Sequence, residues 1–205
     1  MMMRDRKRAS TGSMEQQRTR IVFGEGKSEK VYFDKVQRVY EIPIKTISCE
    51  GDGIERIKKK CEASLRNRKK KDLVAIVIDV DDHTLEQLLE LEKWCNERDV
   101  MLLLSNPAWE VWLNMHFRDV NASMTLNDLN HQLNAEVGGI RYEKGTGIPV
   151  DEKNIEQAYR RADKSLPEKM ATIRNVFSRP GTTNVHRLIA IFRRDSESKK
   201  KSGPK

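Results

Sequence analysis

Three acidic residues stand where buried strands are expected to end. Asp79 and Asp81 close an apolar run that begins at Leu73, and Glu25 follows a second, shorter apolar run and lies between two glycines. An uninterrupted apolar run is typical of a strand that is buried on both faces of a parallel sheet. Carboxylates crowded at the carboxyl ends of such strands repel one another unless a cation lies among them. We therefore predict a divalent metal site formed by Glu25, Asp79 and Asp81.

The chemistry predicted for this site is hydrolysis of a phosphate chain. Magnesium and manganese prefer carboxylate oxygens and leave coordination positions that phosphate oxygens can occupy. An ion held in this way polarises a phosphodiester and activates water, and Glu25 would assist proton transfer. Acids that follow a strand also serve as helix caps, and we interpret Asp82 or Thr84 as the cap of a helix that begins near Leu85.

Two other phosphate motifs fail on spacing. Gly26-Lys27-Ser28 matches the end of a P-loop, but the glycine required five positions before Gly26 is replaced by Ile21. The Asp79-Val80-Asp81 triplet is similar to the paired aspartates of haloacid dehalogenase phosphatases, which have Thr or Val two residues after the second Asp. Here that position holds His83. A phosphatase remains an alternative.

The elements that would position these acids alternate along the chain. We predict strands at residues 20–23, 42–47, 73–80 and 100–104, and helices at residues 28–39, 54–68 and 85–98. This order predicts an α/β fold with a mostly parallel, four-stranded sheet flanked by helices. Apolar residues then recur only at helical spacing, with helices expected at residues 154–164, 167–176 and 184–192, and residues 138–147 are expected to form a glycine-rich loop.

We divide the chain into four parts by composition and pattern. They are a flexible basic N-terminus (1–18), an α/β core (19–118), a helical basic extension (119–194) and a disordered tail (195–205). The three cysteines, Cys49, Cys61 and Cys95, are widely spaced and are expected to be reduced packing residues. Because the chain shows neither an apolar run long enough for a membrane nor a secretion signal, we expect a cytoplasmic protein.

The formal charge of +8 is unevenly distributed. Residues 1–140 contain 23 basic and 23 acidic residues, whereas residues 141–205 contain 16 and 8. A basic region beside an acidic site suits a polyanionic substrate, so we predict nucleic-acid binding, RNA or DNA, through the C-terminal third. The lysine runs at residues 58–60 and 69–71 are interpreted as the solvated surface of a helix.

Four ordered motifs resemble one protein family. They are EGKSE at residues 25–29 with Tyr32-Phe33, DVD at 79–81, SNPAWEVWL at 105–113 with His116-Phe117, and TNVH at 183–186. This pattern, over about residues 20–192, resembles the RloB-like proteins, which are prokaryotic defence-island proteins with a TOPRIM-type core. The resemblance implies that Glu25 takes the position of the TOPRIM glutamate and that Asp79 and Asp81 take its magnesium-binding D-x-D. The TOPRIM enzymes include topoisomerases, primases and the OLD-family nucleases.

Further residues extend the predicted site. Glu29 and Glu110 are candidate metal ligands, although each is also an ordinary residue for the first turn of a helix. Lys144 and His186 are candidate catalytic residues, and for Lys144 an exposed loop lysine is an equal alternative. Trp109 and Trp112 have the spacing of a buried helical face, so we expect them in the core.

These observations lead to one functional prediction with two alternatives. We predict a magnesium-dependent or manganese-dependent endonuclease of the RloB-like, TOPRIM type that acts in antiviral defence, with a further protein partner from the defence system and no membrane association. One alternative is a non-catalytic subunit that binds nucleic acid or a partner protein. The other is a phosphatase-like phosphohydrolase. Activity on small phosphate monoesters would distinguish the last from the first.

Overall fold

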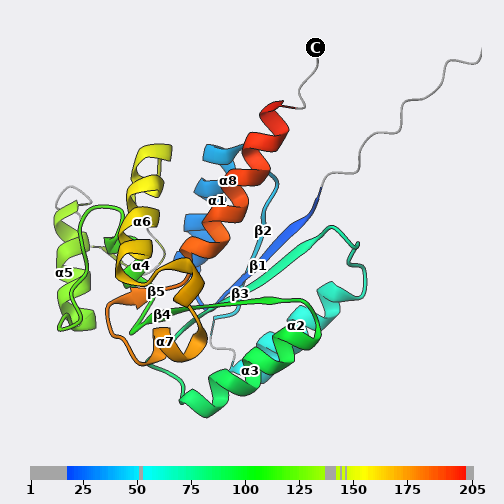
Figure 1. Cartoon of the computed structure of the whole chain (residues 1–205), viewed down its shortest axis with the longest axis horizontal. Coiled ribbons are helices and arrows are strands. Elements are labelled where there is room, and N and C mark those ends of the chain that lie inside the picture. Colours follow the sequence, from blue (N-terminus) through cyan, green and yellow to red (C-terminus); the bar gives the residue numbers. More distant parts are fainter. Residues whose placement is uncertain (1–17, 51–52, 137–141, 144, 146, 202–205) are drawn as a thin grey trace, which may run out of the picture.

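The computed structural model describes most of the chain. The described residues are 18–50, 53–136, 142, 143, 145 and 147–201. They form an α/β fold in which helices cover both faces of a mostly parallel sheet (Figure 1). No helix among the described residues has the length and apolar character needed to cross a membrane.

The sheet has five strands in the order β2-β1-β3-β4-β5. The strands are β1 (Arg20–Gly24), β2 (Lys45–Ser48), β3 (Leu73–Asp79), β4 (Met101–Asn106) and β5 (Thr182–Thr183). The first four are parallel, as the alternation of strands and helices predicts, while β5 is antiparallel to β4. The predicted four-stranded sheet therefore omitted β5, because two residues are too few to show the periodicity of a strand.

Eight α-helices accompany the described strands. They are α1 (Lys27–Tyr40), α2 (Ile54–Leu65), α3 (Leu85–Glu97), α4 (Glu110–Asn114), α5 (Leu126–Glu136), α6 (Glu152–Ser165), α7 (Ile173–Phe177) and α8 (His186–Lys201), with a short 3₁₀ helix η1 (Glu168–Met170) before α7. The helix expected at residues 167–176 is thus two short pieces. Thr172 interrupts it, because its side chain accepts a hydrogen bond from Asn175 N and starts a new helix there.

The sequence of the central strand β3 is apolar without interruption because both of its faces are buried. Ala75 and Val77 pack into one core with α1, α4, α6 and α8, whereas Val74, Ile76 and Ile78 pack into a second core with α2, α3 and α7. Successive side chains of a strand point to opposite faces, so burial on both faces requires apolar residues at every position. Figure 1 shows α2 and α3 on one face and α1 and α8 on the other.

The last helix is longer than its sequence indicates. Residues 195–201, which we expected in a disordered tail, belong to α8. Asp195 forms ion pairs with Arg20 at 2.7 Å and Arg18 at 3.3 Å, and the buried Ser196 hydroxyl donates to the Tyr40 carbonyl at 2.7 Å. These contacts with the first strand and the first helix hold a polar segment in helical form. Residues 202–205, like residues 1–17, lie outside the described part.

Candidate functional site

Five acidic residues gather at the carboxyl end of the sheet. Asp79 ends β3, Glu25 follows β1, Glu110 begins α4 after β4, Glu29 lies in the first turn of α1, and Asp81 follows β3 by two residues. Because the parallel strands end on the same side, residues far apart in the sequence meet there. We refer to Glu25, Glu29, Asp79, Asp81 and Glu110 as the carboxylate cluster. All five were predicted from the sequence.

Gly24 allows Glu29 to approach the end of β1. A Cβ atom at Gly24 would lie 2.6 Å from the Cβ of Glu29, which is closer than two such atoms can pack. The Glu29 carboxylate accepts a hydrogen bond from Gly26 N at 3.2 Å, so it also caps the helix α1. Glu29 therefore caps its helix, as expected for a residue of the first turn, and it also lies among the other acids.

Asp79 is at the electrostatic centre of the cluster. Its side chain is buried, and its Oδ1 has no hydrogen-bond partner among the described residues. Burial raises the pKa of Asp79 well above the usual range, and repulsion from Glu29, Glu25, Glu110 and Asp81 raises it further. A buried oxygen without a donor and with like charges around it is favourable only if the group is protonated or binds a cation.

The pKa of Glu29 is raised for the same reasons as that of Asp79, but to a smaller extent. Burial, followed by repulsion from Glu110 and Glu25, raises the pKa of Glu29 from 4.5 to about 7. Its hydrogen bond from Gly26 N acts in the opposite direction but does not compensate. Near neutral pH the ionised form of this carboxyl group is therefore costly without a cation.

Glu25 connects β1 with the turn after β3. Its Oε2 accepts a hydrogen bond from Asp79 N at 2.9 Å, and its Oε1 lies 3.7 Å from His83 Nε2. Burial raises the pKa of Glu25, and repulsion from Asp82 and Asp81 acts in the same direction, while the Asp79 hydrogen bond and His83 oppose the shift. Glu25 thus holds the end of β3 as well as contributing charge.

The turn after β3 gives Asp81 and Asp82 different roles from Asp79. The strand ends at Asp79, and Val80 N and Asp81 N both donate to the Pro107 carbonyl, at 2.9 and 3.1 Å. Asp81 and Asp82 are exposed. Thr84, and not Asp82, caps α3 by accepting from Gln87 N. Of the two residues that we proposed as caps, Thr84 is the one that does so.

Tyr142 is a member of the site that the sequence analysis missed. Its hydroxyl donates to the buried Ser28 Oγ at 3.3 Å, and Gly145 N donates to the same oxygen at 3.0 Å. Burial and repulsion from Glu110 and Glu29 raise the pKa of Tyr142. Tyr142 lies 114 positions after Ser28 in a glycine-rich part of the sequence. The one hint in the sequence is that its partner Ser28 stands directly before Glu29.

The donor set suits a hard cation, although the ligands are not in place around one. All five side chains offer carboxylate oxygens, which magnesium and manganese prefer, and Asp79 Oδ1 is without a donor. Among the described residues, however, no three acidic, histidine or cysteine side chains lie in an arrangement that would hold an ion as they stand. Glu25 and Glu29 instead accept hydrogen bonds from backbone N–H groups.

His186 contacts residues other than the cluster. Because β5 is antiparallel to β4, the chain runs from Thr183 away from the carboxyl end of the sheet towards His186. The His186 ring packs against Tyr159 of α6, with ring centroids 5.8 Å apart, and burial lowers its pKa to about 4. The structure therefore does not bring His186 together with the carboxylates. Lys144, the other predicted catalytic residue, lies outside the described residues.

The aromatic residues after β4 form the core that their spacing predicts. Trp109 and Trp112 are buried and stack edge-on against Tyr32 of α1, with ring centroids 5.4 and 6.1 Å apart. His116 is buried with them and contacts the Tyr32 hydroxyl at 3.2 Å and the Trp112 carbonyl at 3.1 Å. These side chains hold α4, and with it Glu110, against α1.

Comparison with known proteins identifies the family. The model of the family described as "RloB-like protein" matches residues 20–191, a range that runs from β1 into α8. The chain belongs to the RloB-like family. No curated protein and no solved structure was found to match. The carboxylate cluster and all five strands lie inside the matched range.

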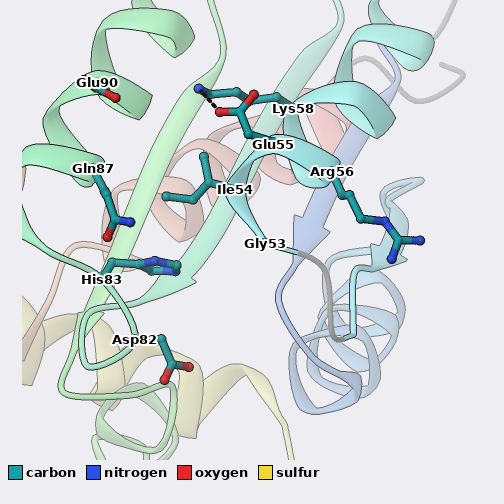
Figure 2. A pocket seen from close by; sticks show the side chains of 9 residues that line it. All are labelled: Gly53, Ile54, Glu55, Arg56, Lys58, Asp82, His83, Gln87 and Glu90. Carbon is teal, nitrogen blue, oxygen red and sulfur yellow. Dashed lines mark hydrogen bonds and ion pairs between the residues drawn. The ribbon is translucent and has the colours of Figure 1, made fainter.

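A pocket adjoins the cluster in this RloB-like chain. It has a volume of about 470 Å³ and lies between the first turns of α2 and α3 (Figure 2). Asp82 and His83 line it on one side, and Arg56 and Lys58 of α2 line it on the other. Because His83 also contacts Glu25, a molecule in this pocket would lie beside the carboxylates.

Proposed function

We propose that this RloB-like protein is a metal-dependent nuclease that hydrolyses phosphodiester bonds in nucleic acid, acting in prokaryotic antiviral defence. The observation that supports this most strongly is the convergence of five carboxylates from separate segments at one end of the sheet, around the buried and unpartnered Asp79 Oδ1. Such an arrangement destabilises the protein unless the acids are protonated or a cation binds. It is consistent with a TOPRIM-type site, which the resemblance of the motifs implies.

The residues have distinct roles in this proposal. Asp79, with Glu25 and Asp81, would hold magnesium or manganese, and Glu29 and Glu110 would complete the negative shell. The bound ion would polarise the scissile phosphodiester and lower the pKa of an attacking water. Glu25, whose pKa burial raises, would accept the proton from that water. Tyr142 and Ser28 would fix the position of the first turn of α1, which carries Glu29.

A non-catalytic binding protein is the second candidate. It is favoured by the hydrogen bonds of Glu25 and Glu29 to backbone N–H groups, which engage two of the five carboxylates in holding the fold. In that case the cluster would bind a structural ion. The protein would bind nucleic acid or a partner protein without cleaving anything.

Asp79→Asn separates these candidates. The purified protein is incubated with transfer RNA, single-stranded DNA and duplex DNA across magnesium and manganese concentrations, with a small phosphate monoester as a phosphatase substrate. We expect wild-type cleavage of nucleic acid and a loss of on the order of 100-fold or more in Asp79→Asn. The matched control is Asp34→Asn, which removes an exposed carboxylate of α1 outside the cluster and should cleave normally.

Folding and metal binding are measured on the same proteins by thermal unfolding. Without metal, Asp79→Asn should unfold at the same or a higher temperature than the wild type, because it relieves repulsion in the cluster. Manganese should raise the unfolding temperature of the wild type and of Asp34→Asn, but not that of Asp79→Asn. A folded Asp79→Asn protein that still cleaves would disprove the proposed site. Metal binding without cleavage of any nucleic acid would favour the second candidate.

A further inference from the structure

The segment from α2 to the start of β3 is strongly basic. Residues 54–72 contain nine basic residues and three acidic ones. Its exposed cations are Arg56, Lys59, Lys60, Arg66, Lys69, Lys70 and Lys71, which we call the α2 ridge. The sequence analysis treated its lysine runs as ordinary solvated surface. The position of this segment in the fold indicates a binding surface instead.

Helical spacing places these cations on one side of α2. Arg56, Lys59, Lys60 and Arg66 lie at positions i, i+3, i+4 and i+10, which fall within a sector of about 120° around the helix axis. The opposite stripe, with Ile57 and Cys61, is buried against the sheet. From Arg56 to Arg66 the ridge extends about 15 Å, which corresponds to four or five phosphates along one strand of a duplex.

Four cations of the ridge are not paired with the acids of the segment. Glu55 pairs with Lys58 at 2.7 Å, Glu62 lies 3.6 Å from Arg98, and Asp72 accepts backbone hydrogen bonds from Thr19 N and Lys69 N. Within the described part of the chain, the side chains of Lys59, Arg66, Lys70 and Lys71 form no ion pair. Their charge is available to a ligand.

The ridge begins beside the carboxylate cluster. Arg56 and His83 both line the pocket (Figure 2). His83 Nε2 in turn lies 3.7 Å from Glu25 Oε1. α2 starts at the carboxyl end of the sheet and runs back along it, so the ridge leads away from the pocket towards the start of β3. A chain of phosphates bound along the ridge would therefore enter the pocket next to the acids.

We propose that the α2 ridge binds the phosphate backbone of nucleic acid and directs it to the carboxylate cluster. The inference rests on the proposed function and specifies the surface that holds its substrate. A row of exposed cations about 15 Å long can contact several successive phosphates of a nucleic-acid backbone. A membrane surface fits less well, because Met170 is the one large apolar side chain exposed among the described residues, and it lies outside α2.

The ridge differs from the C-terminal surface that the net charge suggested. On α8, Arg193 pairs with Glu156 at 2.8 Å and Lys199 donates to the Glu41 carbonyl at 2.7 Å. Those cations hold the helix to its neighbours. Arg194, Lys200 and Lys201 remain exposed on α8 and supply a matched control, because they are also one arginine and two lysines.

The test compares two triple variants in the absence of divalent metal. Lys59→Gln/Arg66→Gln/Lys70→Gln removes three ridge charges, and Arg194→Gln/Lys200→Gln/Lys201→Gln removes three from α8. Binding to fluorescent single-stranded RNA, single-stranded DNA and duplex DNA is followed by anisotropy between about 50 and 200 mM salt. The ridge variant should bind on the order of 10-fold more weakly, with a salt slope lower by about 2 to 3. The α8 variant should bind like the wild type.

Because EDTA prevents cleavage, this test is independent of the nuclease proposal. Asp79→Asn leaves every cation of the ridge in place and should bind at least as tightly as the wild type. A ridge variant that binds like the wild type, or an α8 variant that loses as much, would overturn the inference and leave the nuclease proposal intact. Tighter binding of the wild type to anionic phospholipid vesicles than to any nucleic acid would also overturn it, in favour of a membrane surface.

Discussion

The two ends of the sheet hold acidic side chains in opposite conditions. At the amino end, Asp72 accepts hydrogen bonds from Thr19 N and Lys69 N at 2.9 Å each, and Asp195 pairs with Arg20 at 2.7 Å. Burial would raise the pKa of Asp72, but these hydrogen bonds outweigh it and hold the pKa below its usual value. At the carboxyl end, Asp79 has like charges around it and a raised pKa.

This contrast separates acids that stabilise the fold from acids that are suited to chemistry. A carboxylate with donors on both oxygens contributes stability and needs nothing further. A buried carboxylate among other carboxylates costs stability, and the cost is removed when the group is protonated or when a cation binds. Both ends belong to the same four parallel strands, so the difference comes from the side chains and not from the architecture.

Glu29→Gln should give the largest change in stability. The pKa of Glu29 is about 7 in the folded chain and near 4.5 when unfolded, so the folded state binds more protons in between. Stability of the metal-free protein therefore falls as the pH rises from about 4.5 to 7, by about 3 kcal/mol from this group. Urea denaturation in EDTA should show Glu29→Gln equal to the wild type near pH 4.5 and more stable above pH 7.

Asp72→Asn is the control from the other end, with the opposite sign. Because the folded pKa of Asp72 is lowered, its contribution is present above the unfolded pKa of about 3.8 and is lost as the pH falls through the folded value. The variant should be less stable than the wild type at neutral pH. If both variants changed stability in the same direction, the contrast between the two ends would be wrong.

Arg20→Ala should have the next largest effect. It breaks the ion pair with Asp195, in which the Arg20 side chain is 7% exposed. Breaking a fully buried pair costs about 3 to 5 kcal/mol, and since Asp195 keeps Arg18 as a partner, we expect about 2 kcal/mol. Lys30→Ala removes an exposed pair with Asp34 and should change the unfolding free energy by less than about 0.5 kcal/mol.

Tyr142→Phe should have a smaller effect on stability than Arg20→Ala and a larger effect on activity. Loss of its hydrogen bond to Ser28 Oγ should cost about 1 kcal/mol in denaturant unfolding. If the carboxyl end is the catalytic end, metal-dependent cleavage should fall further than stability does. Tyr159→Phe, outside the cluster, is the matched control and should leave cleavage unchanged. Equal cleavage by both variants would exclude Tyr142 from the site.

The buried strand and the acids around it could be predicted from the sequence for local reasons. The length and composition of the apolar run before Asp79 indicate a strand that is covered on both faces. Because parallel strands end at the same edge of the sheet, acids that follow them lie close together. Gly24 also fits this pattern, because it stands directly before Glu25 and leaves room for Glu29. The positions of all five carboxylates follow from the parallel order of the strands.

Other features could not be predicted because they depend on distant contacts or on averages. Tyr142 meets Ser28 across 114 positions of sequence, and β5 has two residues whose pairing with Ser105 and Asn106 no periodicity shows. The α2 ridge was missed because charge was summed over residues 1–140. Residues 73–140 hold three basic and twelve acidic residues, which cancel the excess of basic residues in residues 54–72. His186 was misplaced because the direction of β5 was unknown.

The contact between Arg20 and Asp195 has a consequence for biosynthesis. The two residues are 175 positions apart, so the ribosome has made almost all of the described chain before the partner of the first strand emerges. At translation rates of about 5 to 20 residues per second, β1 waits on the order of ten seconds or more for it. During that interval the Arg20 guanidinium is without its carboxylate partner, so this ion pair stabilises the finished chain and not the nascent one.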